Sequence, residues 1–501
     1  MSSAPKQTST TPDLSRLAFW PESRWRAFGV RLREIKLNAA SLAGSANILP
    51  NFLPRMRLPL RQWALRQTSS PCNSAARLLI FADAITFDEA QSAFGLDLLT
   101  AMIADGLVNR LSDQTLVSPF RLHLIQDQYI LCDDLVHGAD AVMGPGETTL
   151  SLVKAAEQEG LGRILDLGCG AGGVSIALAH AADSIVATDI NPRALAFGRI
   201  NAAINGANNI EFRLGDLYQP VSGEKFDLIL SQPPFIPMPQ GSKPATYLFG
   251  GPRGDELPMQ VLADTTARLA DGGSAILLIH FPQIAQETIP NRVRAAIRTP
   301  AADLLILQFP PIDLNLFAFA YSSISLPDYG EGFRHEVTTW LDHFRRTGIA
   351  AILPCFAVIR KRGRRKGWTR LALPALGTPT PISIDQLFRR FDLLALDDAG
   401  LLGAALRLRP DAILNAQQPL ATKGETEIRI EFTGAEMNRP AELNREMVQL
   451  LQILNRSSNV DRAVQSCRQK FPDWSRKEIL EIVRESLGLG LLEVVEKLDK
   501  K

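Results

Sequence analysis

Apolar and polar residues between positions 163 and 323 follow a pattern that predicts both strands and helices. Short apolar runs rich in Ile, Leu and Val alternate with longer stretches of helical character. This alternation is typical of an α/β fold, in which a parallel sheet is covered by helices on both faces. We expect seven strands: Arg163–Leu167, Ser184–Asp189, Ile210–Leu214, Phe226–Ser231, Ser274–Phe281, Leu304–Phe309 and Leu316–Tyr321.

The region before this core, residues 17–135, predicts a smaller helical domain. A helix around Ala75–Ala82 is followed by Thr86–Glu89, a capping box that opens a second helix. A third helix covers Leu96–Ala104, and alternating segments within residues 120–132 predict a hairpin. Three helices and a hairpin indicate a winged-helix-like module.

Winged-helix modules often bind DNA, but the composition of the predicted helices argues against that role here. The second and third helices and the turn after them carry acidic side chains, namely Asp88, Glu89, Asp97 and Asp105. Phosphate contacts would need Arg or Lys at these places. We therefore favour a protein-contact or substrate-docking module.

The core domain is expected over residues 142–325. The segments on either side of it differ from the core in composition. Residues 1–16 are rich in Ser, Thr and Pro and predict a disordered tail. Residues 330–430 predict an α+β extension, with a helix near Glu336–Arg346 and strands at Ile349–Ile359 and Trp368–Leu373. Residues 440–501 predict a small helical, winged-helix-like module, in which Ser475–Glu478 is a capping box for the last helix.

Length, charge and cysteine usage exclude several classes of protein. A chain of 501 residues exceeds what one hydrophobic core supports, so several domains are expected. The net charge of +1 indicates no global attraction to nucleic acid or membrane. The five cysteines are scattered without a C-x-x-C pair, and no apolar run is long enough for a signal peptide or a membrane span. We expect a cytoplasmic protein with no metal site and no membrane partner.

Residues 163–174 leave the first predicted strand, turn through glycines and enter a helix. Gly168, Gly170 and Gly172 let the backbone bend sharply and let a ligand approach without meeting a Cβ atom. Asp189 ends the next predicted strand, where a carboxylate can accept hydrogen bonds from both hydroxyls of a ribose. We therefore expect an adenosine-containing ligand across the carboxyl ends of the first two strands.

Two further carboxylates help to identify that ligand. The spacing Gly168-x-Gly170-x-x-Gly173 also fits a dinucleotide fingerprint, so an NAD(P)-dependent oxidoreductase stays open as an alternative. Asp166, just before the turn, would repel a pyrophosphate but suits the ammonium group of S-adenosylmethionine, which has no phosphate. Asp216 follows the third strand, where a side chain can accept a hydrogen bond from an adenine amino group. Turn capping is the alternative role for both aspartates.

The fourth predicted strand ends in Ser231-Gln-Pro-Pro-Phe235. Two consecutive prolines cannot continue a central strand, because neither donates a hydrogen bond to a neighbouring strand. They predict a rigid turn at the carboxyl edge of the sheet, where ligands bind in folds of this kind. The turn would hold an amide (Gln232), a preset carbonyl (Pro233) and an aromatic ring (Phe235) beside the cofactor.

Together these segments resemble the class I S-adenosylmethionine-dependent methyltransferases of the small-methyltransferase-domain type, most closely the release-factor glutamine N5-methyltransferases. The resemblance covers residues 141–323 and implies a Rossmann-like, seven-stranded sheet with S-adenosylmethionine as cofactor. Besides the Pro-Pro turn, it rests on five segments: Val142–Leu150, Leu165–Gly172, Ala187–Pro192, Gly215–Tyr218 and Gly250–Leu257.

The resemblance also implies roles for individual residues. The cofactor-binding residues would be Asp166, Gly168, Cys169, Gly170, Gly172, Asp189, Ile190, Asp216, Leu217 and Ser231. The catalytic residues would be Gln232, Pro233, Pro234 and Phe235. In the family, the side chain at the first of these positions and the first proline carbonyl accept hydrogen bonds from a planar amide nitrogen, and the aromatic ring stacks on the substrate. Such a preset attack geometry favours an in-line methyl transfer.

Gln232 departs from the family pattern, which has Asn at this position. Gln keeps the amide but is one methylene longer. Because productive geometry tolerates displacements of only about half an ångström, this change can alter the substrate. We therefore do not carry over the glutamine of a release factor as the substrate, and the acceptor stays open: a nitrogen or oxygen of a protein side chain or of a small molecule, or a carbon of a small molecule. His280, near the end of the fifth strand, is expected to be structural rather than a base.

Residues 360–370 form the most basic stretch of the chain. One interpretation is a hairpin that grips phosphates of a nucleic acid, with Trp368 available for stacking. The other, which we favour, is a solvated turn between two apolar strands. A nucleic-acid-binding or protein-binding chain that keeps the fold without the activity is the second alternative to a methyltransferase.

Overall fold

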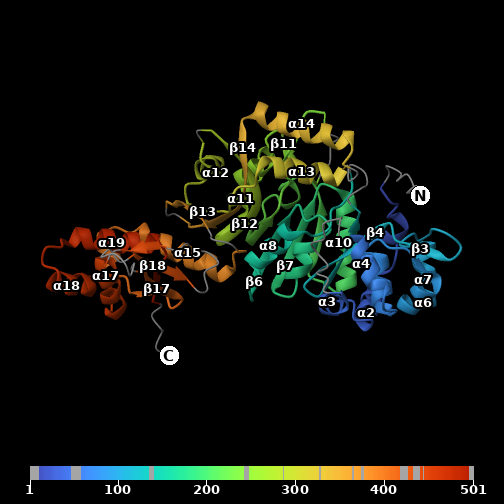
Figure 1. Cartoon of the computed structure of the whole chain (residues 1–501), viewed down its shortest axis with the longest axis horizontal. Helices are drawn as coiled ribbons and strands as arrows, with labels where there is room; N and C mark the ends of the chain where they lie inside the picture. The colour runs from blue at the N-terminus through green and yellow to red at the C-terminus, as the bar shows by residue number, and fades with distance from the viewer. Residues whose placement is uncertain are drawn as a thin grey trace. The chain divides into compact units, whose positions relative to one another are not determined.

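The computed structural model describes residues 11–46, 58–134, 140–241, 247–285, 287–325, 329–363, 366–373, 377–417, 427–432, 441–443 and 445–495 (Figure 1). The chain divides into two compact units. One comprises Met1–Leu304 and Pro310–Gly367, and the other comprises Leu305–Phe309 and Trp368–Lys501. Helices and strands are mixed along the chain, which confirms the expected α/β content.

The elements up to residue 367 are mostly those of the first unit. Its helices are α1 (Ser15–Ala18), α2 (Glu22–Glu34), α3 (Ala39–Ala46), α4 (Leu58–Arg66), α5 (Pro71–Ala75), the π-helical turn η2 (Ala76–Ile80), α6 (Phe87–Phe94), α7 (Leu96–Ala104), α8 (Glu147–Ala156), α9 (Gly173–Leu178), α10 (Pro192–Asn205), the 3₁₀ turn η3 (Gln219–Val221), α11 (Glu256–Arg268), α12 (Ile289–Ala296), α13 (Leu314–Ser325) and α14 (Glu331–Thr347). Its strands are β1 (Ile85–Thr86), β2 (Asn109–Arg110), β3 (Thr115–Val117), β4 (Phe120–Ile125), β5 (Gln128–Asp133), β6 (Leu161–Leu167), β7 (Ala182–Asp189), β8 (Ile210–Leu214), β9 (Phe226–Ser231), β10 (Ile236–Pro237), β11 (Phe249–Gly251), β12 (Leu269–Ile284) and β14 (Ile349–Lys361), with β13 (Ala302–Gln308) crossing the division.

The N-terminal elements follow the predicted order of three helices and a hairpin. The expected capping box is present, because Glu89 N donates to Thr86 Oγ1 at 3.2 Å and Thr86 N donates to Glu89 Oε2 at 2.8 Å. Strands β4 and β5 form the antiparallel hairpin. Most of the predicted tail, residues 1–10, lies outside the described residues. For residues 11–16 the prediction of disorder is wrong, because α1 begins at Ser15. The apolar side chain of Leu14 is buried, which stabilises an ordered conformation here.

A sheet of hydrogen-bonded strands in the order β15-β13-β14-β12-β9-β6-β7-β8, in which β15 is Thr369–Ala372, forms the core. Strands β6 to β9 and β12 lie close to the predicted positions, and the pairs β6–β7, β7–β8, β6–β9 and β9–β12 are parallel. Helix α10 packs on β7 and β8, whereas α8 and α11 pack on β12. This arrangement brings the carboxyl ends of the parallel strands to one edge.

The sheet differs from the prediction of seven strands in three details, the first being that β15, whose residues were expected in a separate extension, is hydrogen-bonded to β13 in this sheet. Residues 316–321 are helical, as part of α13, because Phe317 and Tyr321 stand one helical turn apart and pack on Trp340 and Phe344 of α14. In addition, β14 lies in the sheet, antiparallel to β12, although its residues were expected in a separate extension. Its apolar run is buried almost throughout, which is the reason it adds to the sheet.

The second unit is smaller and has its own core. Its further elements are β15 (Thr369–Ala372), α15 (Pro381–Leu394), α16 (Asp398–Leu402), β16 (Leu406–Leu408), β17 (Ala412–Gln417), β18 (Glu427–Phe432), β19 (Ala441–Leu443), α17 (Arg445–Arg456), α18 (Val460–Lys470), α19 (Arg476–Gly488) and β20 (Leu492–Val494). Apolar faces of α17, α18 and α19 meet in one cluster that includes Leu450, Val464 and Val483. The predicted capping box between Ser475 and Glu478 is present.

Within the basic stretch, the described cations are largely used inside the fold. Arg360 and Arg362 both form ion pairs with the buried Asp303, and Lys361 Nζ lies 3.0 Å from Asp271 Oδ1. Positions 364 and 365 lie outside the described residues.

Trp368 is not available for stacking on a base, contrary to that interpretation of the stretch. The side chain is buried, and Nε1 donates to Asp392 Oδ1 at 2.9 Å. Its ring packs on Phe388 and Phe391. The indole can be buried against the apolar side chains of α15 because it is largely apolar and its one donor, Nε1, is hydrogen-bonded to Asp392.

Candidate active site

The predicted site residues lie at the edge of the sheet where the carboxyl ends of four parallel strands meet. Thr188 of β7 and Ser231 of β9 both pair with Leu167 of β6, and β8 pairs with β7 on its other side. The expected residues at or next to these strand ends are therefore neighbours: Asp166, Asp189, Asp216 and Gln232.

The glycine turn after β6 is anchored to the end of β7. The backbone amides of Gly168 and Cys169 both donate to the Thr188 carbonyl at 2.9 Å. Gly168 and Gly170 have φ angles of +75° and +53°, and a Cβ atom added at either would meet no atom within 4 Å. Glycine is thus used for its backbone conformation, and open space faces the turn. A ligand can approach the backbone here.

Asp189, at the end of β7, is bound on both carboxylate oxygens by backbone amides. Oδ2 accepts from Gly170 N at 2.9 Å, and Oδ1 accepts from Asn191 N at 2.8 Å. Burial raises the pKa of Asp189 above its ordinary value, against the lowering effect of these hydrogen bonds. A carboxylate has about four acceptor positions, so it can still accept from the two hydroxyls of a ribose.

Asp166 is buried beneath the turn and is bound by α9. Its Oδ2 accepts from the hydroxyl of Ser175 at 2.6 Å and from the Ser175 amide at 3.1 Å. Burial raises the pKa of Asp166 to about 6. The carboxylate therefore has the turn-capping role that was the alternative.

The loop after β8 is tied to the same edge, because Gly215 N donates to the Asp189 carbonyl at 3.1 Å. Asp216 is exposed on this loop, and Leu217 has a φ of +45°, which is uncommon for a residue with a side chain. Ile190 is 54% exposed beside Asp189 and offers an apolar surface for a flat base. By contrast, Cys169 is buried, and burial raises the pKa of its thiol.

The Pro-Pro turn is joined directly to the strand that precedes the glycine turn. Ser231 Oγ donates to the Leu167 carbonyl at 2.8 Å. The next residue, Gln232, donates from Nε2 to Thr148 Oγ1 on α8 at 2.6 Å. Phe235 stacks on His280 of β12, with ring centroids 4.3 Å apart and an interplanar angle of 28°. The residues predicted to hold the acceptor and those predicted to hold the cofactor thus share one edge of the sheet.

The segment at residues 250–257, expected to follow the Pro-Pro turn, packs closely on it. A Cβ atom on Gly250 would lie 2.4 Å from the Pro234 carbonyl oxygen, and one on Gly254 would lie 2.5 Å from the Phe235 carbonyl oxygen. Strand β10, after the turn, pairs with β11 of this segment. Glycine is required for this contact, which leaves the turn little freedom to move.

His280 is a buried, neutral ring at this corner. Burial lowers its pKa to about 4, and its Nδ1 atom has no hydrogen-bond partner among the described residues. A ring with so low a pKa is a weak base at neutral pH. Its packing on Phe235 agrees with the structural role expected for it.

Two polar residues at the site were missed in the sequence. Thr148 lies in Val142–Leu150, one of the segments on which the family resemblance rests, so the sequence indicated the segment but not the side chain. Ser175 stands in the first turn of α9, and only the folded helix brings its hydroxyl to Asp166. Thr148 is 84 residues from Gln232 and Ser175 is 9 residues from Asp166. Neither spacing belongs to the period of a helix or a strand, so no sequence pattern marks these two side chains.

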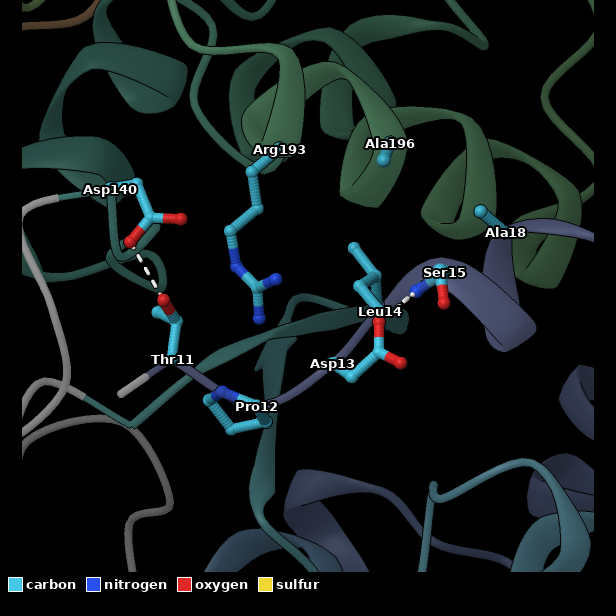
Figure 2. Close-up of a pocket in the computed structure, with 9 residues that line it drawn as sticks. All are labelled: Thr11, Pro12, Asp13, Leu14, Ser15, Ala18, Asp140, Arg193 and Ala196. Carbon is cyan, nitrogen blue, oxygen red and sulfur yellow. Dashed lines mark hydrogen bonds between the residues drawn. The ribbon is translucent and has the colours of Figure 1, made fainter. Parts of the chain in front are cut away.

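A separate pocket of about 460 Å³ lies where residues 11–18 cross the beginning of α10 (Figure 2). Thr11 Oγ1 donates to Asp140 Oδ1 at 2.7 Å across it. Arg193 points into the pocket but is already paired with Asp133, at 2.7 Å from Nε and 2.5 Å from Nη2. None of the residues predicted to bind cofactor or acceptor lines this pocket.

The described ranges hold neither a cluster of metal-binding side chains nor a helix that could span a membrane. No group of three or more His, Cys, Asp or Glu side chains there could hold a metal ion. In the same part of the chain, no helix has both the length and the hydropathy needed to cross a bilayer.

Comparison with known proteins gives relatives for the region that holds this site. The family model of the methyltransferase small domain matches residues 143–247. A protein of Methanocaldococcus jannaschii that is assigned as an N5-glutamine methyltransferase is 31% identical over 179 residues, which are 33% of this chain and 90% of that protein. Release factor glutamine methyltransferases of Xylella fastidiosa and Koribacter versatilis are 33% and 30% identical, over 28% and 32% of this chain. This chain spans 56% and 65% of their lengths.

Proposed function

Because this chain belongs to the class I methyltransferase family that includes the release factor glutamine methyltransferases, we propose that it transfers the methyl group of S-adenosylmethionine to the nitrogen of a side-chain amide. Because the chain belongs to this family, an NAD(P)-dependent oxidoreductase is no longer an alternative. S-adenosylmethionine supplies, when bound, a methyl group on a positively charged sulfur atom.

The residues at the strand ends fit this cofactor. The open face of the turn at Gly168 and Gly170 gives room for its amino acid part, and the Asp166 carboxylate lies below that turn. Asp189 retains acceptor positions for the ribose, and Asp216 and Ile190 are exposed where the base would lie. No basic side chain is needed, because the cofactor carries no phosphate.

The observation that carries the proposal is the hydrogen bond from Ser231 Oγ to the Leu167 carbonyl. It holds the start of the Pro-Pro turn against the end of the strand that leads into the glycine turn. An acceptor at Gln232 and Pro233 is thereby held beside the cofactor, and this proximity is the main catalytic contribution the chain can make.

The chemistry requires no strong base. The acceptor nitrogen forms a bond to the methyl carbon, the carbon–sulfur bond breaks with its electron pair going to sulfur, and one N–H proton leaves to water. Phe235 is buried and stacked on His280, its backbone is held by the segment around Gly250, and we propose that its ring packs on a planar amide.

The test is methyl transfer from S-adenosylmethionine labelled in its methyl group, using the full chain and peptides that contain Gln, Asn, Lys or Glu. We expect label on the amide-containing peptides, released as methylamine by hot acid hydrolysis. Label released as methanol by mild base would indicate an ester, and label that stays on Lys would indicate an amine acceptor. Either result would overturn the amide assignment.

Two variants connect the measured activity to the site. Gln232→Ala should bind S-adenosylhomocysteine as tightly as the wild type but lose turnover by roughly 100-fold or more, as expected when a positioning group is removed. Gln260→Ala, at an exposed position on α11, is the matched control and should leave both quantities unchanged. Unchanged turnover in Gln232→Ala would remove this residue from the mechanism.

We further propose that the helical modules at residues 17–135 and 440–501 are winged-helix-like docking modules for the acceptor protein. The ion pairs within residues 360–362 and the burial of Trp368 support a protein rather than a nucleic acid as the partner. Titration of the full chain with duplex DNA and with RNA at 50 and 200 mM salt should detect no salt-dependent binding. Binding that falls steeply with salt would favour the nucleic-acid alternative.

A further inference from the structure

We infer that Thr148 is a positioning residue that holds the Gln232 amide with its nitrogen turned to α8, so that the carbonyl oxygen Oε1 is the group left for the acceptor. This inference rests on the proposed function. It assigns a role to a side chain on α8, 84 residues before Gln232 in the chain.

The hydroxyl of Thr148 is placed for this purpose rather than for helix capping. Capping at the start of α8 is performed by the next residue, since Gly146 N donates to Thr149 Oγ1 at 3.3 Å. Thr148 Oγ1 accepts instead from Gln232 Nε2 at 2.6 Å. Two adjacent threonines therefore have different functions.

The start of α8 is itself held against the glycine turn. A Cβ atom on Gly173, the first residue of α9, would lie 3.5 Å from Pro145 Cβ and 3.5 Å from Thr149 Cγ2. Helices α8 and α9 pack on each other over this contact. The position of the Thr148 hydroxyl is thus set relative to the turn that would hold the cofactor, and through it the position of the Gln232 amide is set as well.

A glutamine needs such a partner. Its long side chain has three rotatable bonds, and ordering it costs up to about 2 kcal/mol of conformational entropy. A hydrogen bond at the far end of the side chain keeps one arrangement before the substrate binds. The bond to Thr148 therefore compensates for the additional methylene that distinguishes Gln232 from a shorter amide side chain.

The orientation also selects the chemical class of the acceptor. An amide group has donors on its nitrogen and acceptor positions on its oxygen. Nε2 has two N–H groups and uses one of them for Thr148, whereas Oε1 of Gln232 and the neighbouring Pro233 carbonyl can only accept hydrogen bonds. A group that donates two hydrogen bonds, such as the NH₂ of a primary amide, fits this pair, whereas an ester, an ether or a tertiary amine does not.

The test is a double-mutant cycle on the full chain with the amide peptide from the labelling experiment. Thr148→Val should lower kcat by roughly 10- to 30-fold, with the affinity for S-adenosylhomocysteine unchanged. Thr148→Ser keeps the hydroxyl and should stay within about threefold of the wild type. In the Gln232→Ala background, Thr148→Val should have no further effect. Thr338→Val, which removes an exposed threonine hydroxyl that donates to the Arg334 carbonyl within α14, is the matched control and should leave kcat unchanged.

Two results would overturn the inference. One is that Thr148→Val and Gln232→Ala lower kcat independently, so that their effects multiply. The other comes from a measurement that needs no activity: NMR of the side-chain amides in protein labelled with ¹⁵N-glutamine. The Gln232 signal, assigned by its loss in Gln232→Ala, should shift in Thr148→Val and stay in place in Thr148→Ser. An unmoved signal in Thr148→Val would overturn the role of Thr148 even if no amide peptide is methylated, and a shifted signal would support the contact where the proposed activity fails.

Discussion

The backbone amide of Gly170 donates a 2.9 Å hydrogen bond to Oδ2 of Asp189. This bond joins the glycine turn after β6 to the end of β7, so the open face of the turn and the carboxylate keep a constant separation. A ligand with an amino acid part and a ribose would contact both at once. The geometry of the expected cofactor site therefore depends on this pair.

Asp189→Ala should weaken the binding of S-adenosylhomocysteine by roughly 100-fold or more. The variant removes a charged partner for the ribose hydroxyls and leaves the Gly170 amide without its acceptor, and hydrogen bonds to charged groups contribute about 1.5 to 3 kcal/mol each. Isothermal titration measures the affinity. Asp183→Ala, at the exposed beginning of the same strand, is the control and should bind normally. Equal affinities for the two variants would refute the ribose role of Asp189.

Cofactor affinity should depend on pH through Asp166. Because burial raises its pKa to about 6, the carboxyl is mostly neutral at pH 5 and ionised at pH 7. An ammonium group prefers the ionised form, so affinity for S-adenosylhomocysteine should rise by up to about tenfold from pH 5 to pH 7 and level off above. The pKa of Asp189 is also raised by burial, so its titration can change the affinity as well. In Asp166→Asn only this effect is left, and the rise in affinity should be smaller than in the wild type. A wild-type affinity that is constant over this range would contradict the assignment.

Acid should destabilise the fold through His280. Its pKa is about 4 in the folded chain and about 6.5 when unfolded, so between these values the unfolded chain binds the additional proton. The free energy of unfolding is therefore insensitive to His280 above pH 7 and falls as the pH drops from 6.5 toward 4. From pH 7 to pH 5, the wild type should lose about 2 kcal/mol more than His280→Phe, which keeps the aromatic contact with Phe235. Denaturant unfolding at both pH values checks this difference; equal losses would show that His280 does not titrate as described.

Gly29→Ala should destabilise the N-terminal part of the first unit. Helix α2 lies so close to α10 that a Cβ atom on Gly29 would be 2.0 Å from the Ile204 carbonyl oxygen. The backbone must move apart, at a cost of about 1 to 3 kcal/mol. Thermal unfolding should show a lower melting temperature. Gly488→Ala, in a helix where the added methyl meets no atom within 4 Å, should be neutral or slightly stabilising; equal behaviour of both variants would argue against the close helix contact.

Several elements of the fold could be predicted from the sequence because their signals are local. The strands β6, β7, β9 and β12 contain apolar runs, and β8 alternates apolar with charged residues, so each can be recognised without knowledge of its neighbours. The capping boxes at Thr86 and Ser475 depend on residues three positions apart. The neighbourhood of Asp166, Asp189 and Gln232 also follows, because parallel strands connected by helices bring their carboxyl ends to one edge.

Other features depend on contacts between distant residues, and no local pattern records them. The apolar run of β14 predicts a strand, but it does not say in which sheet the strand lies. Pairing with β12 places it in the core sheet. Residues 316–321 were expected as a strand, because a short apolar run has no clear period, and packing on α14 makes them helical. Trp368 is buried because α15 supplies its neighbours.

By itself, the sequence determined where the core strands lie along the chain and where the glycine turn and the Pro-Pro turn follow them. These features depend on residue type and spacing over a few positions. The tertiary structure alone decided which hydroxyl meets the Gln232 amide. Thr148 and Gln232 are 84 residues apart, and the packing of α8 on the start of α9 brings them within 2.6 Å. Backbone preferences act between neighbours in the chain, whereas a hydrogen bond between side chains depends only on their positions in space.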